Sequence, residues 1–170
     1  MFEDVCVMKD LFKEFCCLCK VLNGKLGIVP VLYGSLGLEQ IIDEGFNPVD
    51  IDMLIPEEYF NEKWELLRSI VEKTGYELIN SDEHEFVKDN IKIAFANEDI
   101  LMNDLFINPQ DLKYEETDSL KYRVLTLFDY FKVYKYSVDD GYRRNKNNGK
   151  DLIKIEVIKE AIIGKIRKGR

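Results

Sequence analysis

The stretch that decides the fold runs from Tyr33-Gly34-Ser35 to Asp50-Ile51-Asp52-Met53-Leu54-Ile55-Pro56. An apolar run, Ile28 to Leu32, leads into the Gly-Ser turn, and a second apolar run contains two carboxylates one residue apart. Side chains at positions i and i+2 of a strand leave the same face, so Asp50 and Asp52 should project together from a sheet. Two adjacent carboxylates repel each other unless a cation lies between them. The pair therefore predicts a site for a hard divalent metal, most naturally Mg²⁺ that holds phosphate oxygens.

Length and composition describe a soluble globular protein with a sizeable core. The 170 residues are 46% hydrophobic and 33% charged, and no run approaches the roughly 20 apolar residues that a membrane span needs. The first residues, Met1-Phe2-Glu3-Asp4, are acidic and have no positively charged n-region, so we expect no secretory signal. We therefore expect a cytoplasmic protein that does not bind a membrane.

Charge is distributed unevenly along the chain, whose net charge is −8. Residues 132–170 contain 12 Lys and Arg against 5 Asp and Glu, whereas residues 1–131 contain 12 against 27. The acidic body argues against binding of duplex nucleic acid by the whole protein. The basic end has two interpretations, a wall that faces an anionic ligand or a solvated terminal helix.

The four cysteines, Cys6, Cys16, Cys17 and Cys19, lie in the first predicted helix. A closed zinc site needs four ligands in a tetrahedral array, but no second Cys pair follows and the only histidine is His84, far along the chain. Cys packs well as a small hydrophobic side chain. We therefore expect reduced, mostly buried thiols rather than a metal site.

Hydrophobic periodicity and turn residues predict an α+β fold, a mixed sheet with flanking helices. Helices are expected at 2–22, where Asn23-Gly24 ends the first one, from Ser35 to about 43, from Pro56 to just before Gly75, near 98–103, at about 127–137 and from Asp151 onward. Strands are expected at 28–33, 49–55, 76–79 and on both sides of Asp89-Asn90. We divide the chain into an α/β core, residues 1–112, and a C-terminal helical extension, residues 113–170, packed on it as one compact unit.

The run from Glu83 to Ala96 predicts a hairpin whose two-residue turn is Asp89-Asn90. This turn determines the register of the two strands. The expected pairs are Lys88 with Ile91, Val87 with Lys92, Phe86 with Ile93, and Glu85 with Ala94. Phe86 and Ile93 then lie on one face of the hairpin, and Glu85 and Ala94 share the other.

A strand, a Gly-Ser turn, a helix and a strand with Asp-x-Asp together resemble the polymerase-beta-like nucleotidyltransferase superfamily. The segment with Arg143 and Lys150-Asp151 is similar to the Arg…Lys-Asp signature of antibiotic nucleotidyltransferases and abortive-infection toxins in that superfamily, so the resemblance covers most of the chain. The chain also looks like a group of small uncharacterised bacterial proteins with Tyr-Gly-Ser-Leu-Gly, His-x-Phe-x-Lys-Asp and Asp-Gly-Tyr-Arg-Arg. Some of these are labelled phosphoribosylanthranilate isomerase, which implies a TIM barrel of about 250 residues that this chain is too short to form.

The resemblance implies a nucleotidyltransferase that moves a nucleoside monophosphate from a nucleoside triphosphate to an acceptor hydroxyl. Asp50 and Asp52 would be catalytic and would hold one or two Mg²⁺ ions. Nucleotide binding would fall to Gly34, Ser35, Arg143, Arg144 and Lys150, the first two at a helix N-terminus and the others as cations that neutralise the triphosphate or bind the acceptor.

Active members of the superfamily also use a third carboxylate on a neighbouring strand, at a position that corresponds here to Ala94. The predicted hairpin register places Glu85 directly opposite Ala94 on the same face. The hypothesis is that Glu85 supplies the third catalytic carboxylate from the adjacent strand.

Two other functions stay open at this point. The first is a non-catalytic module of the same fold that binds a nucleotide or a sugar phosphate. The second is a toxin–antitoxin-type protein whose acidic body binds a protein partner. An Asp-x-Asp pair can also cap a turn, and Asp151 can cap the last helix.

Overall fold

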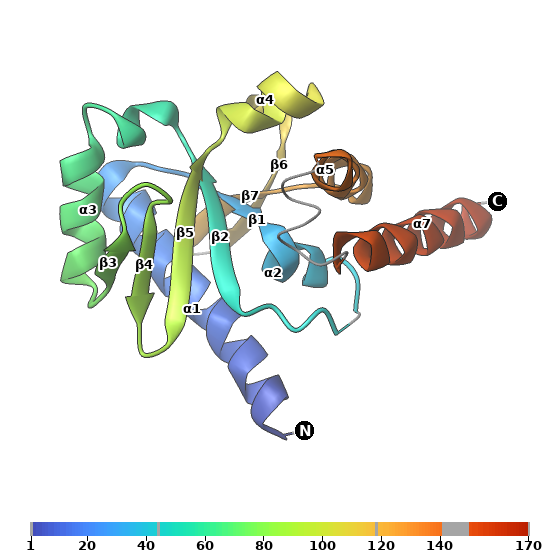
Figure 1. The fold of residues 1–170 in the computed structure, drawn as a ribbon, viewed down its shortest axis with the longest axis horizontal. Coiled ribbons are helices and arrows are strands. Elements are labelled where there is room, and N and C mark those ends of the chain that lie inside the picture. Colours follow the sequence, from blue (N-terminus) through green and yellow to red (C-terminus); the bar gives the residue numbers. More distant parts are fainter. Residues whose placement is uncertain (1, 44, 118, 141–149, 170) are drawn as a thin grey trace.

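One mixed β-sheet forms the centre of the molecule (Figure 1). The computed structural model describes residues 2–43, 45–117, 119–140 and 150–169. Within those residues seven strands pair in the order β3-β4-β5-β2-β1-β7-β6. They are β1 (Val31–Tyr33), β2 (Asp50–Ile55), β3 (Glu77–Asn80), β4 (Glu85–Lys88), β5 (Ile91–Asn97), β6 (Lys113–Thr117) and β7 (Leu120–Val124). The expected mixed sheet with flanking helices is confirmed.

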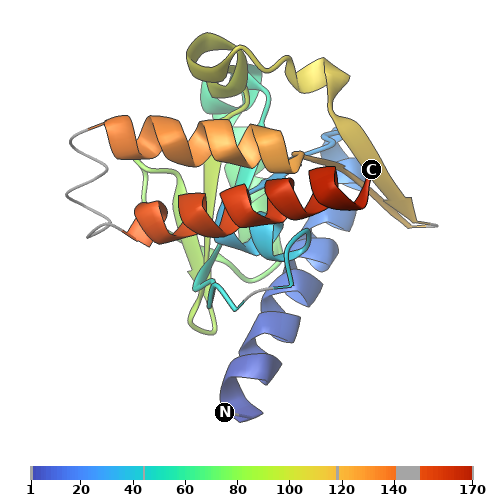
Figure 2. The same ribbon diagram turned by 90° about the vertical axis from the view of Figure 1, so that its right-hand side faces the viewer.

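Helices cover both faces of this sheet. They are α1 (Phe2–Leu26), α2 (Gly34–Glu39), η1 (Glu57–Phe60), α3 (Trp64–Lys73), α4 (Asp99–Leu105), η2 (Pro109–Asp111), α5 (Leu127–Asp139) and α7 (Lys150–Lys168). Helices α1 and α3 pack on one face, in a core with Ile51, Met53, Phe86 and Ile93. Helices α2, α4, α5 and α7 share a second core on the other side of β1 and β2. Figure 2 shows α5 and α7 lying side by side in opposite directions.

The hairpin of β4 and β5 has the predicted register. Glu85 pairs with Ala94, Phe86 with Ile93, Val87 with Lys92, and Lys88 with Ile91. Both turn residues, Asp89 and Asn90, have positive φ angles, 48° and 65°, as a type I′ turn requires. The register therefore follows from a turn that can be read in the sequence.

Three helices differ from the prediction. Helix α2 ends at Glu39 rather than near residue 43. Helix α1 continues past Asn23-Gly24 to Leu26. The Asn23 side chain does not end the helix, because its Nδ2 donates to the carbonyl oxygens of Ile28 and Lys121, at 2.7 and 3.0 Å, and so docks the helix against β7. The helix predicted from Pro56 is also interrupted, with a short η1 helix before α3 begins at Trp64.

The segment from residue 113 corrects the expected start of the helical extension. Residues 113–117 and 120–124 form β6 and β7, and β7 pairs with β1, so this segment belongs to the sheet. A buried ion pair between Arg123 of β7 and Glu98 fixes the strand. Arg123 also donates to the carbonyl oxygens of Val29 and Pro109. The helical part therefore begins at α5, where Thr126 and Asp129 form the predicted capping box.

The described cysteines only partly match the expectation of buried thiols. Cys19 is buried and its Sγ donates to the carbonyl oxygen of Lys121 at 3.2 Å, but Cys17 is exposed and Cys16 is half-buried. Among the helices that the structure describes, none has the length and apolar content to cross a membrane.

Candidate functional site

One pocket of about 890 Å³ collects every described residue that the sequence assigned to the site. It opens between the sheet and the helix pair α5 and α7. Six of its lining residues were predicted from the sequence, namely Gly34, Ser35, Asp50, Asp52, Glu85 and Lys150. Residues that lie more than a hundred positions apart in the sequence therefore share one cavity.

Asp50 and Asp52 leave the same face of β2, at the centre of the sheet. Strand β2 pairs with β5 on one side, which sets Asp50 beside Lys92 and Asp52 beside Ala94. It pairs with β1 on the other side, which sets Asp52 opposite Tyr33. Ile51 and Met53, between and after the two carboxylates, are buried in the core. The alternation of the strand thus holds both carboxylates at the pocket.

The backbone of Gly34 lies against the side chain of Asp52. Its φ angle is +69°, a conformation that costs an L-residue about 1–2 kcal/mol. A Cβ atom at this position would overlap Oδ2 of Asp52. A side chain at position 34 would therefore push the carboxylate away, and only glycine allows the helix α2 to begin directly against it.

Lys92 stands between two carboxylates on the same face of the sheet. Its Nζ lies 3.2 Å from Oε1 of Glu85 and 3.8 Å from Oδ2 of Asp50. Glu85 does lie opposite Ala94 and lines the pocket, as the sequence predicted, but its carboxylate is paired with an ammonium group. Across the described ranges no three His, Cys, Asp or Glu side chains are grouped so that they could share a metal ion. Sequence reasoning did not identify Lys92.

The opposite wall of the pocket comes from α5 and α7 and contains a second residue that the sequence analysis missed, Lys154. Its Nζ lies 3.5 Å from Oγ of Ser35 and 3.6 Å from Oδ1 of Asp151, and it is positioned 5.1 Å from the ring centre of Tyr134. Asp151 in turn accepts a 2.5 Å hydrogen bond from Ser137. The sequence contained only a weak signal for Lys154, namely its position three residues after Asp151 in a predicted helix.

Tyr134 itself is 6% exposed and lines the same pocket. Burial raises the pKa of its hydroxyl above the usual range, and the Asp151 carboxylate raises it further. The hydroxyl therefore stays protonated at neutral pH and can act as a hydrogen-bond donor.

Burial raises the pKa of the Asp52 carboxyl to about 7. The Asp50 carboxylate raises it further, as does Glu85, while Lys92 and Lys154 oppose the shift. A cation placed beside Asp52 would stabilise its ionised form, because an opposite charge favours the charged state.

Comparison with known proteins finds a similar protein in Bacillus subtilis. The chain is 43% identical over 152 residues to the "Uncharacterized protein YnaI" of Bacillus subtilis (strain 168), a match that covers 89% of this chain and 97% of YnaI. The chain belongs to the YnaI family. No family model matches it, and no solved structure matches it.

The basic residues predicted for nucleotide binding are placed only in part in this YnaI-family chain. Lys150 is exposed at the start of α7 and lines the pocket. Arg143 and Arg144 lie outside the described residues. His84 also lines the pocket, and its ring packs edge-on against the rings of Phe60 and Trp64, with ring centres 4.8 and 4.9 Å away.

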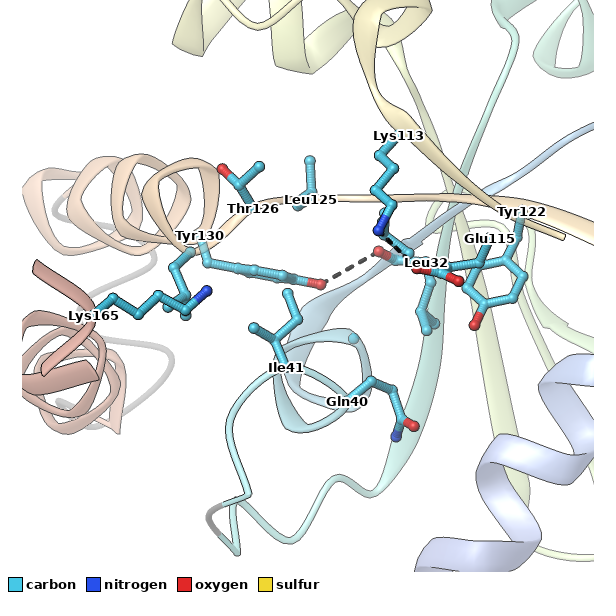
Figure 3. Close-up of a pocket in the computed structure, with 13 residues that line it drawn as sticks. Leu32, Gln40, Ile41, Lys113, Glu115, Tyr122, Leu125, Thr126, Tyr130 and Lys165 are labelled. Carbon is cyan, nitrogen blue, oxygen red and sulfur yellow. Dashed lines mark hydrogen bonds and ion pairs between the residues drawn. The ribbon is translucent and has the colours of Figure 1, made fainter. Parts of the chain in front are cut away.

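A second pocket, of about 390 Å³, lies between α2, β7 and the same helix pair (Figure 3). The Tyr130 hydroxyl points between α2 and β1 and donates to the carbonyl oxygen of Leu32 at 3.4 Å. A Cβ atom at Gly37 would overlap that hydroxyl. In the Tyr-Gly-Ser-Leu-Gly motif of this YnaI-family chain, Gly34 thus makes room for Asp52, and Gly37 makes room for Tyr130.

Proposed function

We propose that this protein is a Mg²⁺-dependent nucleotidyltransferase, which moves a nucleoside monophosphate from a nucleoside triphosphate to a hydroxyl of a small molecule or a protein. The observation that supports this most is the contact of Gly34 with Asp52 in a pocket that also holds Asp50, Ser35 and Lys154. Paired carboxylates suit a divalent cation, and the other groups suit phosphate oxygens.

The donor set fits Mg²⁺. Mg²⁺ is usually held by one or two protein carboxylates and completes its octahedral shell with water and phosphate oxygens. Asp50 and Asp52 supply two such carboxylates on one face of β2, and glycine at position 34 leaves the space beside Asp52 open. When bound, Mg²⁺ would neutralise the phosphates and activate the acceptor hydroxyl.

The residues of the chain have separate parts in this reaction. Ser35 and the N-terminal end of α2 would bind a phosphate from one side, and Lys154 would bind it from the α7 side, where Asp151 orients the ammonium group. The acceptor oxygen attacks the α-phosphorus, the bond from the α-phosphorus to the bridging oxygen breaks, pyrophosphate leaves, and the hydroxyl proton passes to water. Most of the rate would come from positioning and charge neutralisation.

A second candidate function is a non-catalytic module that binds a nucleotide or a sugar phosphate. Ala94 favours it, because the resemblance to the nucleotidyltransferase superfamily implies a third carboxylate at this position in active members. The pairing of Glu85 with Lys92 also favours it, since that carboxylate is already neutralised.

Calorimetry with ATP, GTP, CTP and UTP, each with and without Mg²⁺, tests binding. We expect at least one triphosphate to bind in the presence of Mg²⁺ and not with EDTA. We expect the Asp52→Asn variant to lose this binding, while Asp104→Asn, a change of an exposed carboxylate on α4, keeps it. Absence of binding by all four nucleotides would overturn the nucleotidyltransferase and the nucleotide-binding module, and would leave a sugar-phosphate module or a protein–protein role.

Labels at two positions of the nucleoside triphosphate distinguish nucleotidyl transfer from binding without transfer. With the label on the α-phosphate, a nucleotidyltransferase transfers it to an acceptor, whereas a label on the γ-phosphate leaves with pyrophosphate. Incubation with candidate small-molecule hydroxyls and with cell protein is therefore run with both labels. Transfer of the α-label alone supports the enzyme, and tight binding without transfer supports the non-catalytic module.

A further inference from the structure

Lys92 is the feature of this pocket that the proposed function does not explain. It lies in the middle of the carboxylate-bearing face, where its strand neighbour on one side is Asp50 and on the other is Val87. Its side chain does not run straight out to solvent. Its Nζ lies 3.2 Å from Oε1 of Glu85, in the next row, and 3.8 Å from Oδ2 of Asp50.

The Lys92 ammonium group lies among carboxylates that, without it, would need a second cation between them. Asp50, Asp52 and Glu85 place three carboxylates on neighbouring rows of one face, and burial together with their mutual repulsion makes such a group costly. Two-metal sites bind their ions about 3.5–4 Å apart between shared carboxylates. The ammonium group of Lys92 pairs with two of these carboxylates, Glu85 and Asp50. Asp50 is also one of the two carboxylates proposed to bind the metal ion.

We propose that Lys92 is a built-in cation that takes the place of a second metal ion, so that the pocket binds a single divalent ion at Asp50 and Asp52. The inference rests on the proposed function, because it concerns the same pocket. Glu85 is then a positioning residue that holds the ammonium group rather than a metal ligand.

Stability alone does not account for the arrangement. The side chains of Lys92, Asp50 and Glu85 are 38%, 27% and 23% exposed, and ion pairs with this exposure contribute little to folding. The ammonium group has a larger effect on the local charge, because it pairs with Glu85 on the face of the sheet that also holds Asp50 and Asp52.

Counting bound metal ions tests the proposal without any substrate. Mn²⁺ is titrated into the full chain, and the free ion is measured by electron paramagnetic resonance. The wild-type chain should bind one Mn²⁺. Lys92→Met should bind two, and their proximity should give the exchange-coupled spectrum of a paired site. Lys92→Arg keeps a cation and should bind one.

Two further variants identify the ligand and provide a control. Lys92→Met combined with Glu85→Gln should return to one ion, because the carboxylate that would hold the second ion is gone. Lys159→Met removes a charge of the same sign from the surface of α7, outside the pocket, and should still bind one ion.

A wild-type chain with two ions, or a Lys92→Met chain that still binds one, would overturn the inference and leave the proposed function standing. A chain that binds no Mn²⁺ in any variant would overturn both.

Discussion

The two faces of the same three strands, β2, β5 and β4, serve opposite purposes. On one face Ile51, Phe86 and Ile93 are fully buried beneath α1 and α3. On the other face Asp50, Asp52 and Glu85 line the pocket of about 890 Å³. The two sets alternate residue by residue. A single-residue step along a strand therefore separates a position that stabilises the fold from one that can bind a ligand.

The largest difference between the faces should appear when neighbouring residues of β4 are truncated. Phe86→Ala should lower the free energy of unfolding by about 3–5 kcal/mol, because the ring is fully buried and packs edge-on against Phe95 at 5.9 Å. Glu85→Ala, one residue earlier on the other face, should lower it by less than about 1 kcal/mol. Urea unfolding measures both. Equal losses would contradict the division of the two faces.

Substitution of Gly34 tests how closely the backbone and side chains pack on the polar face of the sheet. Gly34→Ala should destabilise the protein by about 2–3 kcal/mol, because the φ angle of +69° disfavours alanine and the new Cβ overlaps Asp52. Gly24→Ala is a matched control in helix α1, where nothing lies within 4 Å of the added Cβ, and it should stabilise the protein by about 0.5–1 kcal/mol. Thermal unfolding of the two variants provides the comparison. A stabilising Gly34→Ala would show that the backbone there is not constrained.

Much of this division could be predicted from the sequence, for physical reasons that are local. Alternation along β2 placed Asp50 and Asp52 together, and the Asp89-Asn90 turn determined which residue faces Glu85. Both depend only on a few neighbouring residues. The capping box of α5 was found for the same reason.

The rest depends on packing between distant segments. Lys154 meets Ser35 across 119 positions of sequence, and no local pattern reports that contact. Strand β6 was missed because all five of its residues are exposed, so it lacks an alternating apolar face. Its partner β7 was missed with it, although Arg123 is buried there.

The charge of Asp52 should make the stability of the free protein depend on pH. A folded-state pKa near 7 means that the native chain holds the proton more tightly than the unfolded chain, whose Asp titrates near 3.8. This contribution to stability is fully present below about pH 4 and is lost as the pH rises through about 7.

The Asp52→Asn substitution removes this loss of stability at high pH, because asparagine does not titrate. The variant should therefore nearly match the wild-type chain at pH 4 and exceed its stability by roughly 3–4 kcal/mol at pH 8, in urea unfolding with EDTA. Asp104→Asn, an exposed change on α4, should differ from the wild-type chain by less than about 0.5 kcal/mol at both pH values. The idea that Asp52 is strained by burial fails if the Asp52→Asn difference is the same at pH 4 and pH 8.

The smallest effect on stability should come from Lys154, where the expected change is in binding. Lys154→Met keeps the length of the side chain and its packing over the Tyr134 ring, so the free energy of unfolding should change by less than about 1 kcal/mol. Affinity for inorganic triphosphate should fall roughly tenfold, since one partly buried charge facing Ser35 is lost. Lys159→Met, on the same helix and paired with Glu156 at the surface, should leave the affinity unchanged. Isothermal calorimetry separates the two lysines, and equal losses of affinity would mean that the triphosphate responds only to the overall charge of α7.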